Sequence, residues 1–261
     1  MTLKYSANLG MMFTEEEDPI ARIGAAAAAG FKAIEFLFIY DLELDAIWRE
    51  MDAHEQDMSV INIAVGEGIQ MGPLVMAAPG KQEAFRENLA AGVKYASALK
   101  PTGFVIPAYM PPEGVSRAEA IEVFKENLPA VGDAMGDIGV PVLIEALNPD
   151  IRPKSILRDT AEIMEVIDAV GHPNIGIEYD VYHMYTTEPD MIAVIREHLD
   201  LIGNIQIADT PGRGEPGTGE IDYGTFLKDL DELGYDKWVA LEYMPTVPTL
   251  ESLEWMKTLA A

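Results

Sequence analysis

The stretch that decides the fold is "GNIQIADTPGRGEPGTGEIDYGTFLKDLDELG", residues 203–234. Its apolar, alternating run at 204–209 is typical of a buried β-strand, and that run ends at Asp209. A loop rich in glycine and proline follows, and a helical pattern then closes on Gly234. Strand, irregular loop and helix in this order make one β/α unit, and the polar Gln206 inside the strand needs an explanation.

The same alternation runs along the whole chain. Short β-like runs, separated by amphipathic helical patterns, lie at 3–9, 33–38, 59–65, 103–109, 140–147, 174–181, 204–209 and 238–243. Eight strands alternating with about eight helices in 261 residues predict an α/β fold, a (β/α)8 TIM barrel, and we expect one domain spanning 1–261. The main alternative is a doubly wound open sheet. That fold usually has a glycine-rich phosphate turn after its first strand, which "ANLGMMF" is not.

The charge of the chain narrows its partners. It has 44 acidic and 18 basic residues, a formal net charge of −26. Such a surface repels phosphate backbones, so we expect no nucleic-acid partner, whereas a divalent cation is favoured. Because the chain has no cysteine, disulfides and cysteine-based zinc sites are excluded.

The sequence also bears on location. We find no apolar run of the roughly 18 residues that a membrane span requires. The N-terminal "MTLKYSANLG" lacks the features of a secretory signal. We therefore expect a cytoplasmic protein without a membrane partner, and a homo-oligomer is among the assemblies that the sequence leaves open.

Polar side chains stand where five of the predicted strands end, which in a barrel is the active-site end. A single acid there is more often a helix cap or a loop residue. Glu145, Gln206 and Glu242, however, directly follow apolar runs, where valine or isoleucine is expected. Burying an unpaired carboxylate costs several kcal/mol or forces it to be neutral. Oxygen-bearing side chains that converge on one Mg²⁺ or Mn²⁺ ion explain these positions together.

Several motifs then resemble a known family. "IEALN", "EYDVYHM", "QIADTPGRGEPGTGEIDY" and "ALEYMP", in this order and spacing, resemble the hydroxypyruvate isomerase family, as do "SANLGMMF" and "GFKAIEFLFIYD" near the N-terminus. This family belongs to the xylose-isomerase-like TIM barrels, together with the ketose 3-epimerases. The resemblance covers nearly the whole chain and is strongest from 140 to 245.

The resemblance implies an isomerase that converts hydroxypyruvate to tartronate semialdehyde through an enediolate, with a divalent metal bound. It implies acid/base roles for Glu145 and Glu242 and contacts with the small-molecule substrate for His183 and Arg213. Glu35 corresponds to an acid lining the barrel mouth and is grouped with the substrate-binding residues. The implied metal ligands are Glu145, Asp180, Gln206 and Glu242.

The chain departs from the family pattern at 62–80 and 107–114, the loops that roof the substrate, so the metal chemistry is better supported than the substrate. A ketose 3-epimerase uses the same two glutamates but usually has histidine where Gln206 stands. A DNA-repair endonuclease of the same superfamily needs a multi-histidine zinc cluster and a basic groove, which four histidines and a charge of −26 disfavour. A non-enzymatic binding barrel would tolerate loss of one glutamate, and both are present.

The loop at 210–220 has the composition of a ligand-binding loop. We expect its glycines to adopt positive φ and to bring the backbone close to a ligand: Gly212, Gly214, Gly217 and Gly219. Arg213 then supplies a fixed cation over the site. Glu215 and Glu220 are expected to order this loop or to cap the helix that follows.

Overall fold

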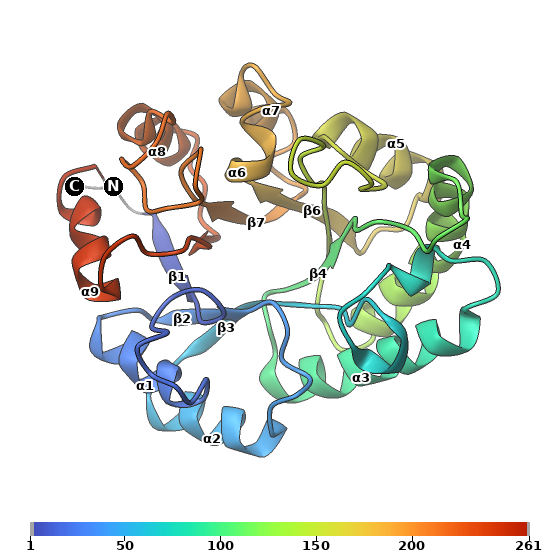
Figure 1. Cartoon of the computed structure of the whole chain (residues 1–261), viewed down its shortest axis with the longest axis horizontal. Helices are drawn as coiled ribbons and strands as arrows, with labels where there is room; N and C mark the ends of the chain where they lie inside the picture. Colours follow the sequence, from blue (N-terminus) through green and yellow to red (C-terminus); the bar gives the residue numbers. More distant parts are fainter. Residues whose placement is uncertain (1–2, 260–261) are drawn as a thin grey trace.

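The structure, a computed structural model, describes residues 3–259, and within them eight parallel strands close into a barrel in chain order. Figure 1 shows the strands at the centre and the helices around them. The predicted TIM barrel is therefore confirmed. The strands are β1 (Lys4–Asn8), β2 (Ala33–Phe36), β3 (Asp57–Asn62), β4 (Gly103–Pro107), β5 (Val142–Glu145), β6 (Ile175–Asp180), β7 (Ile202–Ile207) and β8 (Trp238–Leu241). That residues 1–261 form one domain is kept as a proposal.

Each strand lies where the sequence predicts it, but all eight end earlier than predicted at their C-terminal ends. The run expected at 59–65 is paired only over Asp57–Asn62, and the run at 140–147 only over Val142–Glu145. The apolar residues just beyond the strands stay buried in the loops of the barrel mouth, as Ile63, Val65 and Leu147 do. Apolar pattern alone therefore overestimates strand length at this end.

Helices cover the outside of the barrel. They are α1 (Ala21–Ala28), α2 (Leu44–Ala53), α3 (Gln82–Leu99), α4 (Arg117–Gly136), α5 (Thr160–Val170), α6 (Val181–Met184), α7 (Met191–Glu197), α8 (Tyr223–Glu232) and α9 (Thr249–Ser252). Short 3-10 turns lie at Glu67–Ile69, Val75–Ala77 and Leu253–Lys257. Among residues 3–259, no helix is both long and apolar enough to cross a membrane.

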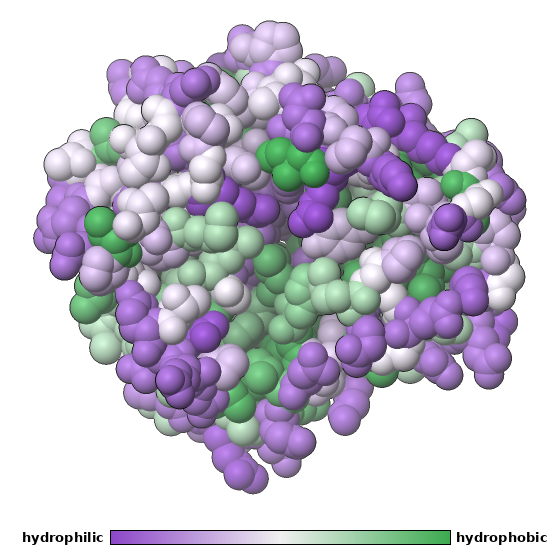
Figure 2. Space-filling model, viewed as in Figure 1, coloured by the Kyte–Doolittle hydropathy of each residue, from purple (hydrophilic) through white to green (hydrophobic). Residues whose placement is uncertain are grey.

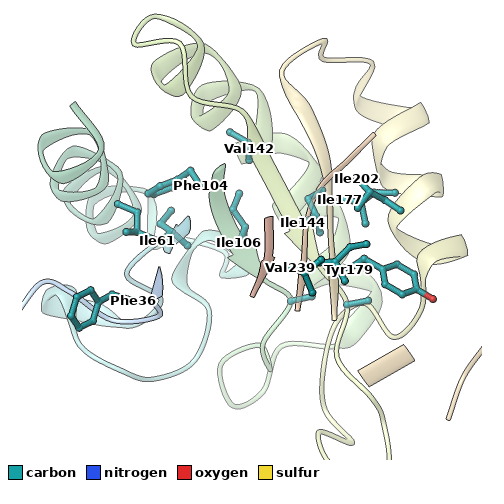
Figure 3. Packing of buried hydrophobic residues seen from close by; sticks show 14 of the residues in the cluster. Phe36, Ile61, Phe104, Ile106, Val142, Ile144, Ile177, Tyr179, Ile202 and Val239 are labelled. Carbon is teal, nitrogen blue, oxygen red and sulfur yellow. The ribbon is translucent and has the colours of Figure 1, made fainter. Parts of the chain in front are cut away.

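Alternation along each strand separates two environments. In β6, Ile175, Ile177 and Tyr179 belong to the large hydrophobic cluster between strands and helices, part of which Figure 3 shows. The alternate residues of β6, including Glu178 and Asp180, face the interior because successive side chains of a strand point to opposite faces. The outer face thus supplies the core, and the inner face is free to carry polar chemistry.

The barrel interior is apolar at one end and polar at the other. Val60, Val105 and Leu143 form a separate buried cluster. Glycines make room for Leu143: a Cβ atom on Gly103 or Gly203 would lie 2.5 or 2.4 Å from its methyl groups. A cavity of about 530 Å³ opens at this N-terminal end, lined by Leu143 and Gly203 among others. It lies away from the strand-end carboxylates, so we assign it no part in the chemistry.

Glu178 lies between these two ends, and its Oε1 accepts a hydrogen bond of 2.7 Å from Asn204. Burial, with the nearby Glu35 charge, raises the pKa of Glu178 well above its usual value, although the Asn204 hydrogen bond opposes this. A raised pKa in the folded state means that stability falls as pH rises from the unfolded pKa toward the folded one.

We predict that Glu178→Gln stabilises the metal-free protein at pH 8, because the amide never ionises. The gain arises because the wild-type carboxyl must at pH 8 either ionise in its buried site or hold a proton that the unfolded chain releases. It should shrink toward pH 4, where the wild-type carboxyl is protonated in both states. Urea unfolding at both pH values measures this, and a gain that grows toward pH 4 would contradict it.

Candidate active site

The predicted site residues gather at the C-terminal ends of the strands. Glu145 is the last residue of β5, Asp180 the last of β6, and Glu242 directly follows β8. Gln206 lies in β7 and pairs in register with Asp180, so these two stand at the same level on neighbouring strands. All four side chains are buried or nearly so.

Close contacts through His183 and Arg213 link the three acids of this set. His183 Nε2 lies 3.9 Å from Glu145 Oε1 and 3.5 Å from Asp180 Oδ2. One terminal nitrogen of Arg213 lies 3.3 Å from Asp180 Oδ2 and 2.7 Å from Glu242 Oε1. The result is a continuous chain of charged and polar groups from β5 to β8.

Glu145, Asp180 and His183 form the tightest group. One ligand atom from each lies within 4.8 Å of the others, a spacing that can hold a metal ion. His183, which the sequence predicts as a substrate contact, is therefore a member of this group together with two predicted ligands, Glu145 and Asp180. Glu242 lies outside the group, and its Oε1 is turned toward Arg213. The roles of these residues as ligands or bases stay predictions.

Gln206 and Glu35 meet in the interior behind this group. Gln206 Nε2 donates to Glu35 Oε1 at 3.0 Å, and both side chains have no exposed surface. Asn8 Nδ2 donates to the same Glu35 oxygen at 2.6 Å. Glu35 thus contacts the amides of β1 and β7, and its predicted contact with substrate stays a prediction.

The acids have raised pKa values because they are buried away from solvent and lie close to one another. Burial, followed by the Asp180 charge, raises the pKa of Glu145 to about 8. Burial raises the pKa of Glu35 to about 7, against the two amide hydrogen bonds. Burial also raises the pKa of Glu242 well above its usual value, although Arg213 opposes it. Accumulated negative charge is therefore the electrostatic problem of this site.

The two basic groups respond in opposite ways. Burial lowers the pKa of His183 to about 4, despite the nearby Asp180 charge, so the imidazole is neutral at pH 7. Burial also works against the Arg213 cation, but Glu242, Asp180 and Glu145 outweigh it and raise the pKa of Arg213 above its usual value. Arg213 is thus a permanent cation, whereas His183 offers a neutral donor or ligand.

The residues present fit a divalent cation. With every group ionised, Glu35, Glu145, Asp180, Glu242 and Arg213 carry three net negative charges, which a divalent ion would reduce to one. Gln206 Oε1 and Glu242 Oε2 are buried oxygens without a hydrogen-bond partner in the described part of the chain. Carboxylate and amide oxygens suit Mg²⁺ or Mn²⁺.

Asp209 organises the loop that carries Arg213. Its two buried carboxylate oxygens accept hydrogen bonds of 2.8–3.1 Å from the backbone N–H groups of Thr210, Gly217, Gly219 and Ile221. A Cβ atom on Gly219 would lie 2.2 Å from Thr210 O and 2.5 Å from Asp209 Oδ1. The loop therefore folds tightly around one carboxylate, and glycine is required at 219 for space.

The prediction for the loop glycines is right at Gly212 and Gly217, whose φ values are 107° and 94°. It is wrong at Gly214 and Gly219, which lack positive φ and are limited by close contacts instead. Arg213 itself adopts a φ of 58°, a backbone conformation that the sequence does not indicate. The left-handed conformation is unfavourable for a residue with a side chain, and here the surrounding loop imposes it.

Further contacts fix Arg213 from both sides. Its guanidinium stacks 4.9 Å from the ring centre of Tyr182. Met244 N donates to Arg213 O at 2.8 Å. Glu215 orders the loop as predicted, because its carboxylate accepts from Thr246 N and Oγ1 at 2.9 and 2.6 Å. The cap of α8 is Asp222, not Glu215 or Glu220, since Asp222 accepts from the backbone of Thr225.

Arg152, in the loop after β5, is a cation that the sequence reasoning missed. Its guanidinium lies 5.8 Å from the ring centre of Tyr109. Its charge also acts on Glu145 and His183, lowering the pKa of each as a minor contribution beside their burial. A basic residue in the first turn after a strand-end glutamate was the available signal.

Figure 2 shows the face hollowed over the barrel, with hydrophobic residues on the side of α1–α3 and hydrophilic residues opposite.

This fold, with an acidic cluster at the strand C-termini, defines a TIM-barrel enzyme of the kind that builds its site on the strand ends. The sequence matches the family model described as xylose isomerase-like TIM barrel over residues 23–259. The chain belongs to this family.

Individual relatives agree with that family. Hydroxypyruvate isomerase of Escherichia coli (strain K12) is 34% identical over 254 residues, covering 97% of this chain and 98% of the relative. A 2-oxo-tetronate isomerase of Cupriavidus necator is 32% identical, covering 97% of both. Among solved structures, an "AP endonuclease, family 2" from Brucella melitensis has a TM-score of 0.89 at 31% identity and 98% coverage of both chains. The chain is an isomerase, and the resemblance to the hydroxypyruvate isomerase family is confirmed.

We predict that Asp209→Asn destabilises the protein by at least about 3 kcal/mol, because hydrogen bonds to a charged group are worth about 1.5–3 kcal/mol each and two are lost. The amide NH₂ would also face two backbone donors. Urea unfolding measures the loss, and limited proteolysis should cut within 210–220. The matched control is Asp222→Asn, where either residue caps a helix well and little should change. Equal behaviour of the two variants would contradict the role of Asp209.

Proposed function

We propose that this enzyme interconverts hydroxypyruvate and tartronate semialdehyde (2-hydroxy-3-oxopropanoate), using Glu145 and Glu242 for proton transfer and a divalent ion. The observation that carries the proposal is the chain of contacts from Glu145 through His183, Asp180 and Arg213 to Glu242. It brings three buried acids, a neutral imidazole and a permanent cation to one place. The names of the relatives support a small oxo-acid as substrate. A cytoplasmic enzyme is kept in the proposal as the sequence predicts it.

The reaction removes a proton from one carbon of the substrate and adds a proton to the adjacent carbon. One proton leaves C3 of hydroxypyruvate, an enediolate forms, and one proton is added at C2. The hydroxyl proton passes from O3 to O2, so atoms and charge balance. Glu145 and Glu242 stand on β5 and β8, strands separated by two others around the barrel. A flat enediolate between them meets one carboxyl group on each face, so one removes the C3 proton and the other delivers a proton to C2.

The free oxygen of Glu242 supports this role. Its Oε1 pairs with Arg213, while its Oε2 is buried and has no hydrogen-bond partner in the described residues. A base needs one oxygen held in place and one free for the proton. His183, neutral because burial lowers its pKa, has an unpartnered Nδ1 that suits a hydrogen bond to a substrate oxygen.

Glu145, Asp180, Gln206 and Glu242 would hold the ion, which we propose is Mg²⁺ or Mn²⁺. When bound, such an ion supplies Lewis-acid polarisation of substrate oxygens. Arg213, which is permanently charged, binds the substrate carboxylate, since its planar fork matches two carboxylate oxygens. Arg152 adds positive potential from the loop after β5.

A second candidate is the same reaction on a longer oxo-acid, which the match to 2-oxo-tetronate isomerase favours. The proton transfers would be identical, and only the space under the loops at 62–80 and 107–114 would differ. A ketose 3-epimerase is less favoured because Gln206 stands where those enzymes usually have histidine. An endonuclease is disfavoured by the net charge of −26. The metal-binding group in the described residues also contains a single histidine.

We predict that Glu145→Gln and Glu242→Gln each lower kcat about 10²–10⁴-fold, the usual worth of a positioned acid or base. Each amide keeps an oxygen but cannot carry the proton, so KM should change little. The double variant should cost little more than the worse single one, because groups acting as a unit are non-additive.

Steady-state kinetics with hydroxypyruvate measures these effects. The matched control is Glu188→Gln, a buried carboxylate that bonds Tyr179 and the backbone of Thr160 away from the cluster. This control should keep near-normal kcat. Wild-type turnover by either glutamate variant would remove that residue from the mechanism.

We predict that Arg213→Lys raises KM for hydroxypyruvate about 10–100-fold, because a charge-assisted hydrogen bond is worth about 1.5–3 kcal/mol. Dihydroxyacetone, a neutral analogue without the carboxylate, should lose far less on the same substitution. Arg196→Ala, on the exposed face of α7, is the control. An equal loss for both compounds would show that Arg213 does not read the carboxylate, and neutral ketoses as the better substrates would favour an epimerase.

We predict that chelation abolishes activity and that Mg²⁺ or Mn²⁺ restores it. Either ion at about 100 times its dissociation constant should stabilise the fold by about 2.7 kcal/mol, because it binds only the folded state. Circular dichroism after chelation checks that the barrel stays folded. Full activity of a preparation shown by elemental analysis to be metal-free would contradict the proposal.

A further inference from the structure

Glu35 reaches across the barrel interior to β7. It pairs in register with Asn8 on the adjacent β1, yet β2 and β7 are separated by two strands. Its Oε1 accepts from Asn8 Nδ2 at 2.6 Å and from Gln206 Nε2 at 3.0 Å. A single buried carboxylate oxygen therefore fastens the amides of two distant strands.

This contact fixes which end of the Gln206 amide faces Glu35. Glu35 Oε1 accepts from Gln206 Nε2 as well as from Asn8 Nδ2, so the Gln206 NH₂ group faces this carboxyl group. Gln206 Oε1 is therefore directed away from Glu35. That oxygen is buried and has no hydrogen-bond partner between residues 3 and 259. The two ends of an amide are nearly equal in shape, so without an acceptor the reversed orientation competes.

Asn8 is fixed in turn from its other end. Its Oδ1 accepts the backbone N–H of Gly10 at 2.9 Å, which leaves its NH₂ group for Glu35. Backbone, Asn8, Glu35 and Gln206 thus form one directed series of donors and acceptors. Each member has its orientation set by the previous one.

We infer that Glu35 is a positioning residue, which acts through Gln206 by holding its amide oxygen toward a bound divalent cation. The inference rests on the proposed function, in which Gln206 is a metal ligand. It differs from the predicted contact of Glu35 with substrate. Partners of this kind orient metal ligands, and their substitution typically costs about 10–100-fold in metal affinity.

The chain offers a matched control in Glu178. Like Glu35, it is a buried glutamate of the barrel interior whose Oε1 accepts from an amide, here Asn204 at 2.7 Å. Asn204 precedes Gln206 by two residues on β7 and is not among the proposed ligands. Shortening either glutamate makes the same local change, but only Glu35 holds a ligand.

Two conservative variants separate orientation from charge. Glu35→Asp keeps the charge but withdraws the acceptor by one methylene, and Glu35→Gln keeps an acceptor at the same reach without the charge. We expect Glu35→Asp to weaken Mn²⁺ binding about 10–100-fold. Glu35→Gln should lose clearly less, and Glu178→Asp should bind like wild type. Titration calorimetry of Mn²⁺ into metal-free protein, with thermal unfolding of each variant, gives both affinity and folding.

The coupling with Gln206 is the second arm. If Glu35 acts only through Gln206, adding Glu35→Asp to Gln206→Leu should weaken Mn²⁺ binding no further. A residue that contacts the ion or the substrate by itself would give additive losses.

Four results would overturn the inference: Mn²⁺ binding by Glu35→Asp equal to wild type, a larger loss in Glu35→Gln than in Glu35→Asp, an equal loss in Glu178→Asp, or additive losses with Gln206→Leu. Failure of the proposed function looks different. In that case the wild-type protein binds no divalent ion, or Gln206→Leu binds it normally.

Discussion

The ion pairs of Arg213 with Asp180 and Glu242 are the constraint on which the barrel mouth depends. Several buried carboxylates raise one another's pKa, and removing one partner of a buried ion pair typically costs about 3–5 kcal/mol. The loop at 209–221 holds this cation in place. Asp209 gathers its backbone, Glu215 ties it to Thr246, and Tyr182 lies under the guanidinium. Packing, loop geometry and electrostatics therefore converge on one side chain.

The rest of the barrel makes this concentration of charge tolerable. Outward-facing residues build the core against the helices, so the inner face need not be apolar throughout. Val60, Val105 and Leu143 form a buried apolar cluster toward the N-terminal end, and the polar residues lie toward the other end. Charge at that end is destabilising unless compensated, and the divalent ion that we propose would compensate it as well as supply chemistry.

The sequence predicted the eight strands and placed Glu145, Asp180, Gln206 and Glu242 at the C-terminal ends of neighbouring strands, because period and strand-end position determine both. It did not predict the positive φ of Arg213, since that conformation is imposed by loop contacts rather than by the residue itself. The Asn8–Glu35–Gln206 series was also missed, because it joins strands that are distant in sequence. Arg152 was missed because its partners, Tyr109 and the acid cluster, come from other parts of the chain.

The central claim is that one protein carboxylate removes a proton from C3 of the substrate and a second carboxylate delivers another proton to C2. Isomerisation of hydroxypyruvate in D₂O, with the product trapped at once by reduction, tests it most directly. With two glutamates acting on opposite faces, the proton delivered to C2 comes from a group that exchanges with solvent, so the account predicts deuterium at C2 of the product. Product incubated alone in D₂O controls for spontaneous exchange. Hydrogen at C2 that derives entirely from C3 of the substrate would mean an internal hydride shift or transfer by a single shielded base, and either would contradict the account.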